Sequence, residues 1–584
     1  MKKVLLILTA LCLALCGCVQ KGNVSDASGT DTSGTADAFG ETLSVGDLYG
    51  NVPQENDLTV TYVSGTEGCY TLTEDTLTFA GVAEDTVYAV SGTFVGRIVI
   101  DAGEYKFDLE LCGLSLACGT DVPITVTGGD EVSLTAKKGT ENFVYDKREA
   151  VGEDGTSGAI HSNVDLEICG KGSLSVVSEQ NNGIHGKDDL QVKNLTLTVH
   201  CADNALKGND SVEMTSCNAV LIATAGDGIK TSASDISDKG NQRGDVTVSD
   251  SNVTVYAACD GIDAAHDVTV GGETVLHICT DKYSSYTVQA EVRGGPGGGG
   301  RPGGGVPPGG FGGGFGGPGG MQEGNPDKAE TSAKGIKAAN AVSLEGGEIT
   351  VKSYDDAVHA SNGTVLESGE SALGNITVSG GVITLYSNDD GMHADGALCI
   401  SGGTVSVSGS YEGLEGSTVS VTAGDVSVVA SDDGINSTGT SGEGVRIGGG
   451  TLFVSAGGDG IDSNSRDSYK GIVFAGGDAV LISSSGGNSA IDTERGYTYE
   501  RGRVLALMPM GGMTSEATHC SNFSSVATQK SVSASGVLCV KVGGETALEV
   551  GFSGSMHCTA IYLGSTDASF ESRQGDTLDG VNWK

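Results

Sequence analysis

The pentapeptide DDGMH, residues 389–393, decides the fold because variants of it recur along most of the chain. Each copy has Gly or Ala at position three, an aliphatic residue or Met at position four and a polar residue at position five. The twelve copies are SGAIH (157–161), NNGIH (181–185), DNALK (203–207), GDGIK (226–230), CDGID (259–263), AKGIK (333–337), DDAVH (355–359), DDGMH (389–393), YEGLE (411–415), DDGIN (432–436), GDGID (458–462) and NSAID (488–492). Most successive copies are 21 to 26 residues apart, which gives a base period of about 22 residues. Such a period is typical of a solenoid in which one repeat stacks on the next.

The segments between the pentapeptides have the pattern of β-strands. GGTVSVSGS (402–410) and GGTLFVSAG (449–457) each place alternating apolar and polar residues after a Gly-rich turn. The chain has 95 glycines and 9 prolines, and no sustained helical spacing of apolar residues follows the N-terminal segment. We therefore predict an all-β protein: a parallel β-helix, a solenoid of about 22 residues per coil, with a C-terminal β cap. A β-propeller needs a period near 40 or more, and an immunoglobulin-like sandwich has no reason to repeat one pentapeptide.

The N-terminal residues are not expected to join the solenoid. Residues 1–18 contain two lysines, an apolar run and a small-residue end, which indicates a secretory signal rather than a membrane span. They resemble a bacterial lipoprotein signal, in which Cys18 is the acylated residue, and residues 19–55 are predicted to be a flexible polar tether. The other predicted parts are a β-helix over 56–495, a Gly/Pro-rich loop inserted at 294–320 and a C-terminal β cap over 496–584. We expect an extracellular monomer that is attached to the membrane only through its lipid anchor.

Charge and cysteine content narrow the possible partners. Acidic residues outnumber basic residues by 75 to 33, which gives a formal charge of −42. Repulsion at long range argues against nucleic acid as a partner, and an acidic ligand can bind only where a cation or a local basic patch intervenes. Twelve of the 15 cysteines follow the signal, and none of these twelve forms a CxxC metal pair. Export permits disulfides, but several cysteines lie inside strand-like runs, so stacked free thiols are the favoured interpretation.

Position five of the pentapeptides is predicted to form an outer edge of the solenoid. Side chains alternate along an extended segment, so position five points outward when position four points into the core. The aligned side chains are His161, His185, Lys207, Lys230, Asp263, Lys337, His359, His393, Glu415, Asn436, Asp462 and Asp492. The alternative is a solvated corner that binds nothing specific. Zinc is not favoured because no three histidines fall within one coil and its neighbours.

The aspartates of the repeat predict calcium as the cofactor. Equivalent carboxylates in adjacent coils lie about 5 Å apart, so they repel each other and suit a shared hard cation with oxygen ligands. The predicted ligands are Asp432, Asp433, Asp459 and Asp462 as the best cluster, then Asp355, Asp356, Asp389 and Asp390, with Asp260 and Asp263 around a further Gly-Ile corner. The alternative is that Asp and Asn only make side-chain-to-backbone turns, which need no metal.

The sequence also resembles a known family. The segment SLTAKKGTENFVYD (133–146), the DDGI and KGIKA forms of the pentapeptide and the Gly/Pro-rich insertion look like secreted clostridial carbohydrate-binding proteins. These proteins have a right-handed parallel β-helix similar to that of polysaccharide lyases, and the likeness runs from about residue 60 to near the C-terminus. The resemblance implies binding of plant cell-wall polysaccharide, namely cellulose and acidic sugars such as polygalacturonate, with calcium on the helix surface.

The same resemblance implies a relation to pectate lyases of the β-helix type. In those enzymes calcium sits on an aspartate cluster with an Asp-Asp pair, and a nearby lysine acts as base. DDGIN (432–436) matches this pattern, with Asn436 where a further aspartate is wanted. A base of this kind needs a lowered pKa, and the candidate bases by column position are Lys207, Lys230 and Lys337.

Binding without catalysis is the favoured function. Lys337 lies roughly four coils, or about 20 Å, from Asp432. Lysines on a solvated corner usually serve only as solubilising charges. A calcium-dependent pectate lyase is the alternative, and a surface adhesin or structural stalk is a third possibility. The expected polysaccharide contacts are His359, His393, Tyr354, Tyr386, Tyr411, Glu412 and Glu415.

Overall fold

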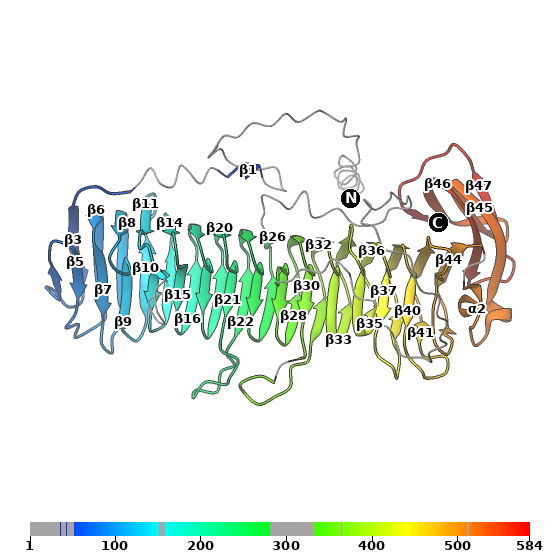
Figure 1. The fold of residues 1–584 in the computed structure, drawn as a ribbon, viewed down its shortest axis with the longest axis horizontal. Helices are drawn as coiled ribbons and strands as arrows, with labels where there is room; N and C mark the ends of the chain where they lie inside the picture. The colour runs from blue at the N-terminus through cyan, green and yellow to red at the C-terminus, as the bar shows by residue number, and fades with distance from the viewer. Residues whose placement is uncertain are drawn as a thin grey trace, which may run out of the picture.

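The computed structural model describes residues 52–150, 158–280, 332–363, 365–510 and 513–584, together with the backbone of β1 (Thr35–Ala36) and β2 (Thr42–Leu43). The described chain forms a long rod in which strands follow one another in chain order from one end to the other (Figure 1). The predicted signal with Cys18, nearly all of the predicted tether and the Gly/Pro-rich stretch at 294–320 lie outside these residues.

Each coil contributes strands to three parallel sheets. The pentapeptides form the first, which we name the repeat sheet: β5 (Thr76–Phe79), β7 (Arg97–Asp101), β9 (Ile124–Gly128), β12 (Gly158–Ser162), β15 (Asn182–Gly186), β18 (Leu206–Gly208), β21 (Ile229–Thr231), β24 (Ile262–Ala264), β27 (Ile336–Ala338), β30 (Val358–Ala360), β33 (Met392–Ile400), β35 (Leu414–Val421), β37 (Ile435–Ser437) and β40 (Ile461–Ser463). The second sheet takes the later halves of β33 and β35 and the strands β6 (Thr86–Val95), β8 (Phe107–Cys118), β10 (Val132–Ala136), β13 (Leu166–Gly170), β16 (Asp189–Lys193), β19 (Ser211–Thr215), β22 (Asp245–Ser249), β25 (Asp267–Gly271), β28 (Ala341–Leu344), β31 (Asn375–Val378), β38 (Val445–Ile447), β41 (Ile472–Phe474) and β43 (Thr498–Tyr499). The third sheet takes the later halves of β6 and β8 and the strands β11 (Glu141–Asp146), β14 (Ser173–Ser178), β17 (Thr196–Cys201), β20 (Asn218–Ala223), β23 (Asn252–Ala257), β26 (Val275–Thr280), β29 (Glu348–Ser353), β32 (Val382–Ser387), β34 (Thr404–Val407), β36 (Asp425–Ala430), β39 (Thr451–Ala456), β42 (Asp478–Ser483) and β44 (Arg503–Pro509).

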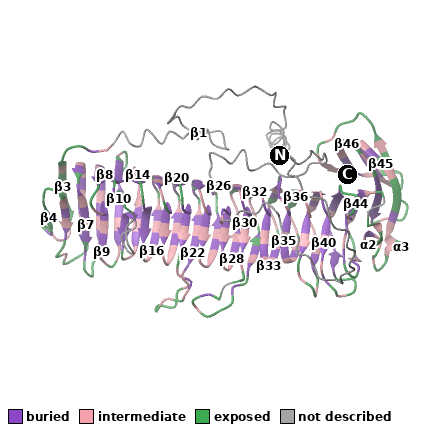
Figure 2. Cartoon of the chain, in the orientation of Figure 1, coloured by how far each residue is buried: buried purple, intermediate pink, exposed green. Residues whose placement is uncertain are grey.

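The register of the repeat sheet is the one that the pentapeptide predicts. Position four of each copy pairs with position four of the next, from Ile160 opposite Ile184 to Ile435 opposite Ile461. These position-four side chains are fully buried, and Figure 2 shows buried residues running the length of the rod. The predicted parallel β-helix is therefore confirmed, and a continuous apolar stack at position four holds the coils together.

The ends and the long insertions depart from the regular coil. Antiparallel strands cover both ends: β3 (Asp57–Ser64) lies against β6 and β4 (Tyr70–Leu72) against β5, whereas β46 (Glu545–Leu563) lies against β44. The remaining C-terminal elements are α2 (Thr514–Ala517), α3 (Phe523–Val526), β45 (Ala527–Val542), β47 (Ser569–Arg573) and β48 (Val581–Trp583). The connections from β21 to β22 and from β30 to β31 protrude from one side of the rod (Figure 1), as the repeat steps of 33 and 34 residues predict.

The cysteines that follow the predicted signal form no disulfides in the described chain. All twelve cysteines from Cys69 to Cys558 are free thiols, and seven of them are buried. This agrees with the favoured interpretation, in which they pack as small apolar side chains.

Among the residues that the structure describes, no helix has both the length and the apolar composition of a membrane span.

Candidate functional site

Position two of the pentapeptides forms a ladder of side-chain oxygens beside the repeat sheet. In eight places the Oδ1 atom of Asn or Asp accepts a hydrogen bond from the backbone N–H of position two in the next coil, at 2.5 to 3.2 Å. The acceptors are Asn182, Asn204, Asp227, Asp260, Asp356, Asp390, Asp433 and Asp459. Sequence reasoning considered side-chain-to-backbone bonds only as an alternative to metal binding, but the ladder gives each of these residues a structural function. Each aspartate in the ladder uses only Oδ1 for this bond, so its Oδ2 can bind a second partner.

Lys334 interrupts the ladder because an ammonium group cannot accept a hydrogen bond. Its side chain is buried, and its Nζ lies 2.7 Å from Asp355 Oδ2 and 2.8 Å from Asp356 Oδ2. Asp355 Oδ1 replaces the missing acceptor by binding the N–H of Asp356 at 3.0 Å. The ammonium group of Lys334 therefore contacts both Asp355 and Asp356, the first aspartate pair of the second predicted calcium cluster.

Two further lysines neutralise the aspartates that flank Lys334 on its N-terminal side. Lys230 Nζ lies 2.6 Å from Asp227 Oδ2 and 2.7 Å from Asp263 Oδ2. Lys337 Nζ lies 3.0 Å from Asp260 Oδ2 and 3.1 Å from Asp263 Oδ1. Burial opposes the charge of Lys230, but Asp263 and Asp227 raise its pKa above the usual value. Because a proton-abstracting lysine needs a lowered pKa, the geometry does not favour Lys230 as a base.

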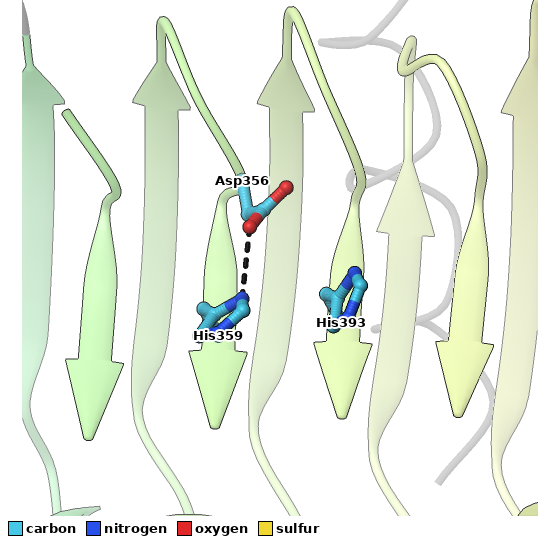
Figure 3. Close-up of side chains that lie close together, drawn as sticks. All are labelled: Asp356, His359 and His393. Carbon is cyan, nitrogen blue, oxygen red and sulfur yellow. Dashed lines mark hydrogen bonds and ion pairs between the residues drawn. The ribbon is translucent and has the colours of Figure 1, made fainter. Parts of the chain in front are cut away.

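Histidine takes the place of lysine in the next two coils (Figure 3). His359 Nδ1 lies 2.9 Å from Asp356 Oδ2, and His393 Nδ1 lies 2.8 Å from Asp390 Oδ2. Burial acts to lower the pKa of His393, but the hydrogen bonds that its ring donates to Asp390 and Asp395 raise it to about 11. Three members of the second predicted cluster, Asp355, Asp356 and Asp390, thus have a lysine or a histidine as side-chain partner. We name the four pentapeptides 226–230, 259–263, 333–337 and 355–359 the lysine segment.

In the last four pentapeptides, which we name the acid segment, Glu415 has His393 Nδ1 3.5 Å from its Oε2, but Asp459 and Asp462 lack such compensation among the described residues. The four pentapeptides are 411–415, 432–436, 458–462 and 488–492, and within the described chain no lysine, arginine or histidine forms an ion pair with Asp459 or Asp462. Burial, with Asp433 and Asp492 close by, raises the pKa of Asp459 to about 7 and that of Asp462 to about 8. Burial, with Asp390 and Glu415 close by, raises the pKa of Glu412 to about 11. This segment contains Asp432, Asp433, Asp459 and Asp462, the best predicted cluster.

Asn436 lies in the middle of the acid segment. It pairs in register with Glu415 on one side and Asp462 on the other, and its Nδ2 donates to Glu412 Oε2 at 2.9 Å. Its Oδ1 is buried and has no hydrogen-bond partner among the described atoms. A buried amide oxygen without a partner is costly, so this atom is a candidate ligand atom for a cation.

The remaining predicted residues are more scattered. Tyr386 lies in β32 on the third sheet, Tyr411 is at position one of its pentapeptide, and Tyr354 directly precedes position one, so the three tyrosines form no single row. Lys207 is aligned between His185 and Lys230, and no described carboxylate forms an ion pair with it.

Position five was predicted to be an outer edge, and this is wrong for the first coils. His161 and His185 are only 1% and 5% exposed, whereas the later members of the column are half-buried. In the described part of the chain, His161 Nε2 has Asn163 Oδ1 at 3.3 Å as its hydrogen-bond partner.

Comparison with known proteins identifies the family. A family model described as carbohydrate-binding domain-containing protein matches residues 74–375 and 412–561, which is most of the chain. A carbohydrate-binding domain-containing protein of Acetivibrio thermocellus is 29% identical over 193 residues, and this match spans 32% of the chain and 60% of the relative. A solved structure titled as the polysaccharide lyase-like protein from C. thermocellum, gadolinium derivative, aligns with 24% identity and a TM-score of 0.32 over 38% of this chain and 97% of its own. The chain therefore belongs to the family of carbohydrate-binding domain-containing proteins.

Proposed function

We propose that the protein binds plant cell-wall polysaccharide on its repeat sheet and that calcium in the acid segment takes part in this binding. The preferred ligands are acidic glycans such as polygalacturonate, with cellulose as a second ligand. Calcium supplies the positive charge that a protein of formal charge −42 needs to hold a polyanion.

The observation that carries the proposal is the missing counter-charge beside Asp459 and Asp462. Their raised pKa values mean that the folded chain holds these carboxyls at a cost in free energy when no cation is present. Carboxylates and an amide carbonyl are the oxygen ligands that calcium uses, and the buried Oδ1 of Asn436 adds such a carbonyl. Asp432, Asp433 and Asp492 complete the set of oxygens in adjacent coils.

The lysine segment has a different role in this proposal. Lys230, Lys334 and Lys337 already neutralise its aspartates, so calcium is not needed there. Binding is therefore concentrated on the coils from Glu412 onward. His393 is adjacent in register to Glu415 and adds a hydrogen-bond donor at the edge of that surface.

We also propose that the protein acts at the outer surface of the cell membrane. Acylation of Cys18 anchors the chain to the outside of the cell membrane, and the polar residues 19–55 hold the rod away from the surface. Metabolic labelling with a fatty acid tests this part: the label is expected on the full chain and is lost from Cys18→Ala.

Affinity electrophoresis on polygalacturonate, and pull-down on insoluble cellulose, test the central claim. Calcium should retard the wild-type protein and a chelator should release it, and Asp459→Asn/Asp462→Asn should bind at least tenfold more weakly in calcium. The matched control is Glu104→Gln/Asp130→Asn, which removes the same charge from two exposed residues near the N-terminal end of the rod. Equal retardation of both variants contradicts the proposal. Ultraviolet absorbance of unsaturated uronate, followed in the same mixtures, detects the lyase alternative.

A further inference from the structure

Two histidines on neighbouring coils form a second cluster outside the acid segment. His359 and His393 are direct partners in the parallel pairing of β30 and β33. Their rings are stacked with centroids 4.9 Å apart and planes 27° apart, and Figure 3 shows them side by side on adjacent strands. The stacking holds the two imidazole planes close to parallel.

Each imidazole is oriented by a buried carboxylate. Asp356 Oδ2 binds Nδ1 of His359 at 2.9 Å, and Asp390 Oδ2 binds Nδ1 of His393 at 2.8 Å. A carboxylate on one ring nitrogen fixes the other nitrogen as the ligand atom, which is the arrangement that surrounds metal-bound histidines in proteins. In this cluster Nε2 of His359 is left for a ligand, whereas Nε2 of His393 contacts Asp395 Oδ1, and an ion that binds there replaces the proton between the two atoms.

A third ligand atom lies beside these nitrogens. Asp395 Oδ1 is 3.3 Å from His393 Nε2, whereas Asp395 Oδ2 is held by the backbone N–H of Asn362 at 2.9 Å. Two ligands of a four-coordinate zinc ion, each about 2.1 Å from the metal, are roughly 3.4 Å apart. Oδ1 of Asp395 and Nε2 of His393 therefore already have the separation that such an ion imposes.

We propose that His359 Nε2, His393 Nε2 and Asp395 Oδ1 bind one divalent transition-metal ion of the zinc class. Two imidazole nitrogens and one carboxylate suit zinc, cobalt, nickel or copper, whereas calcium takes oxygen ligands. The side chains of the three ligands are 15%, 22% and 31% exposed, so the ion has access to solvent and keeps a position for water or another ligand. The site uses none of the carboxylates proposed to bind calcium, but it shares His393 with the edge of the proposed polysaccharide surface.

The opposite side of the rings does not suit the ion. One ligand atom each from Asp356, His359 and His393 also lies within 4.8 Å of the other two. Lys334 Nζ, however, is 2.8 Å from Asp356 Oδ2, so an ion on that oxygen meets a buried ammonium group. The Nε2 side has no described lysine or arginine paired with its carboxylate, Asp395.

The test is a titration of the full chain with CoCl₂ in saturating calcium, followed by visible absorption, with ZnCl₂ as competitor. Wild type should bind one equivalent of cobalt with a visible ligand-field spectrum that zinc abolishes. Asp395→Asn, His359→Gln and His393→Gln should each weaken this binding at least tenfold. His557→Gln, which removes an exposed histidine in β46, should leave it unchanged.

The design separates folding from ligation. Asp395 is partly exposed, so its variant should stay folded, which its circular dichroism spectrum checks. Wild-type cobalt binding in Asp395→Asn and in both histidine variants overturns the proposal, as does a wild type that binds no more cobalt than the three variants. Polygalacturonate binding by wild type and Asp395→Asn reports on the calcium proposal separately, because Asp395 is not part of the proposed polysaccharide surface, so failure of one proposal is not failure of the other.

Discussion

The lysine segment and the acid segment have the same backbone and differ in how their carboxylates are neutralised. In both, position two supplies an oxygen to the N–H of the next coil, as Asp260 does for Lys334 and Asp433 does for Asp459. In the lysine segment an ammonium group then binds the second carboxylate oxygen. In the acid segment no described side chain does this for Asp459. The ladder needs a side-chain oxygen at position two, which Asn or Asp supplies, and where it is Asp the fold leaves open whether lysine or a metal ion neutralises the charge.

The largest expected effect comes from removing the lysine that interrupts the ladder. Lys334→Met keeps the aliphatic stem but leaves Asp355 and Asp356 buried without their ammonium partner. Removing one partner of a buried ion pair typically costs about 3–5 kcal/mol. We expect a loss of that size in the free energy of unfolding in urea at neutral pH.

Lys207 provides the matched control for this change. It occupies position five of its pentapeptide, and no described carboxylate forms an ion pair with it. Lys207→Met should therefore change the free energy of unfolding by no more than about 0.5 kcal/mol. Equal losses in both variants would show that the lysines act through packing and not through charge.

Calcium removal should affect stability through the acid segment, and more strongly at higher pH. In the calcium-free protein the folded state keeps protons on Asp459 and Asp462 up to pKa values of about 7 and 8, whereas the unfolded chain releases them above roughly pH 4. Stability from these groups is thus greatest at low pH and falls as pH rises through that window. Calcium should raise the melting temperature by about 3 °C or more at pH 8 and by much less at pH 5. A calcium effect that is equal at both pH values contradicts this assignment.

Substitution of one carboxylate at the same pentapeptide position should have opposite effects in the two segments. Asp263 lies between Lys230 and Lys337, and although burial acts to raise its pKa, Lys337 and Lys230 hold it below the usual value. Asp263→Asn should destabilise the protein by about 1.5–3 kcal/mol, because a carboxylate shared by two lysines is lost. Asp462→Asn should stabilise the calcium-free protein by about 1 kcal/mol at pH 8, since it removes a buried charge that has no partner. Urea unfolding in a chelator measures both, and changes of the same sign would show that the segments do not differ as inferred.

The register of the repeat sheet could be predicted from the sequence because equivalent positions of the pentapeptide recur once in each coil. The aliphatic residue at position four recurs at one-coil steps, so stacking it fixes every neighbour in the repeat sheet, including Ile262 opposite Ile336 across the step of 74 residues. Extra residues leave the coil as connections and do not shift this pairing. Parallel stacking of identical positions is thus a property of the sequence that needs no tertiary information.

The roles of individual polar residues could not be predicted in the same way. An aspartate at position two looks the same in sequence whether its second oxygen binds Lys337, His393 or a metal ion, because that partner comes from another position in its own or a neighbouring coil. The one available signal was the shared polarity of position two from Asn182 onward, which indicates a backbone acceptor more than a metal ligand. The burial of His161 was also hidden, since position five changes from buried to half-buried along one column.

The smallest expected effect is a difference in protonation between two histidine pairs that occupy the same column. Burial lowers the pKa of His161 to about 4 and that of His185 to about 3, whereas Asp390 and Asp395 overcome burial and raise the pKa of His393 to about 11. Nitrogen NMR of the histidine rings, in protein stripped of divalent ions at about pH 5.5, should find the first pair neutral and His393 protonated on both nitrogens. The reason lies at position two, where the coil of His185 carries an asparagine and that of His393 carries a buried aspartate. If all of these rings titrate together near their ordinary pKa of about 6.5, the carboxylates of position two do not control the charge of position five, and the comparison between the segments loses its physical basis.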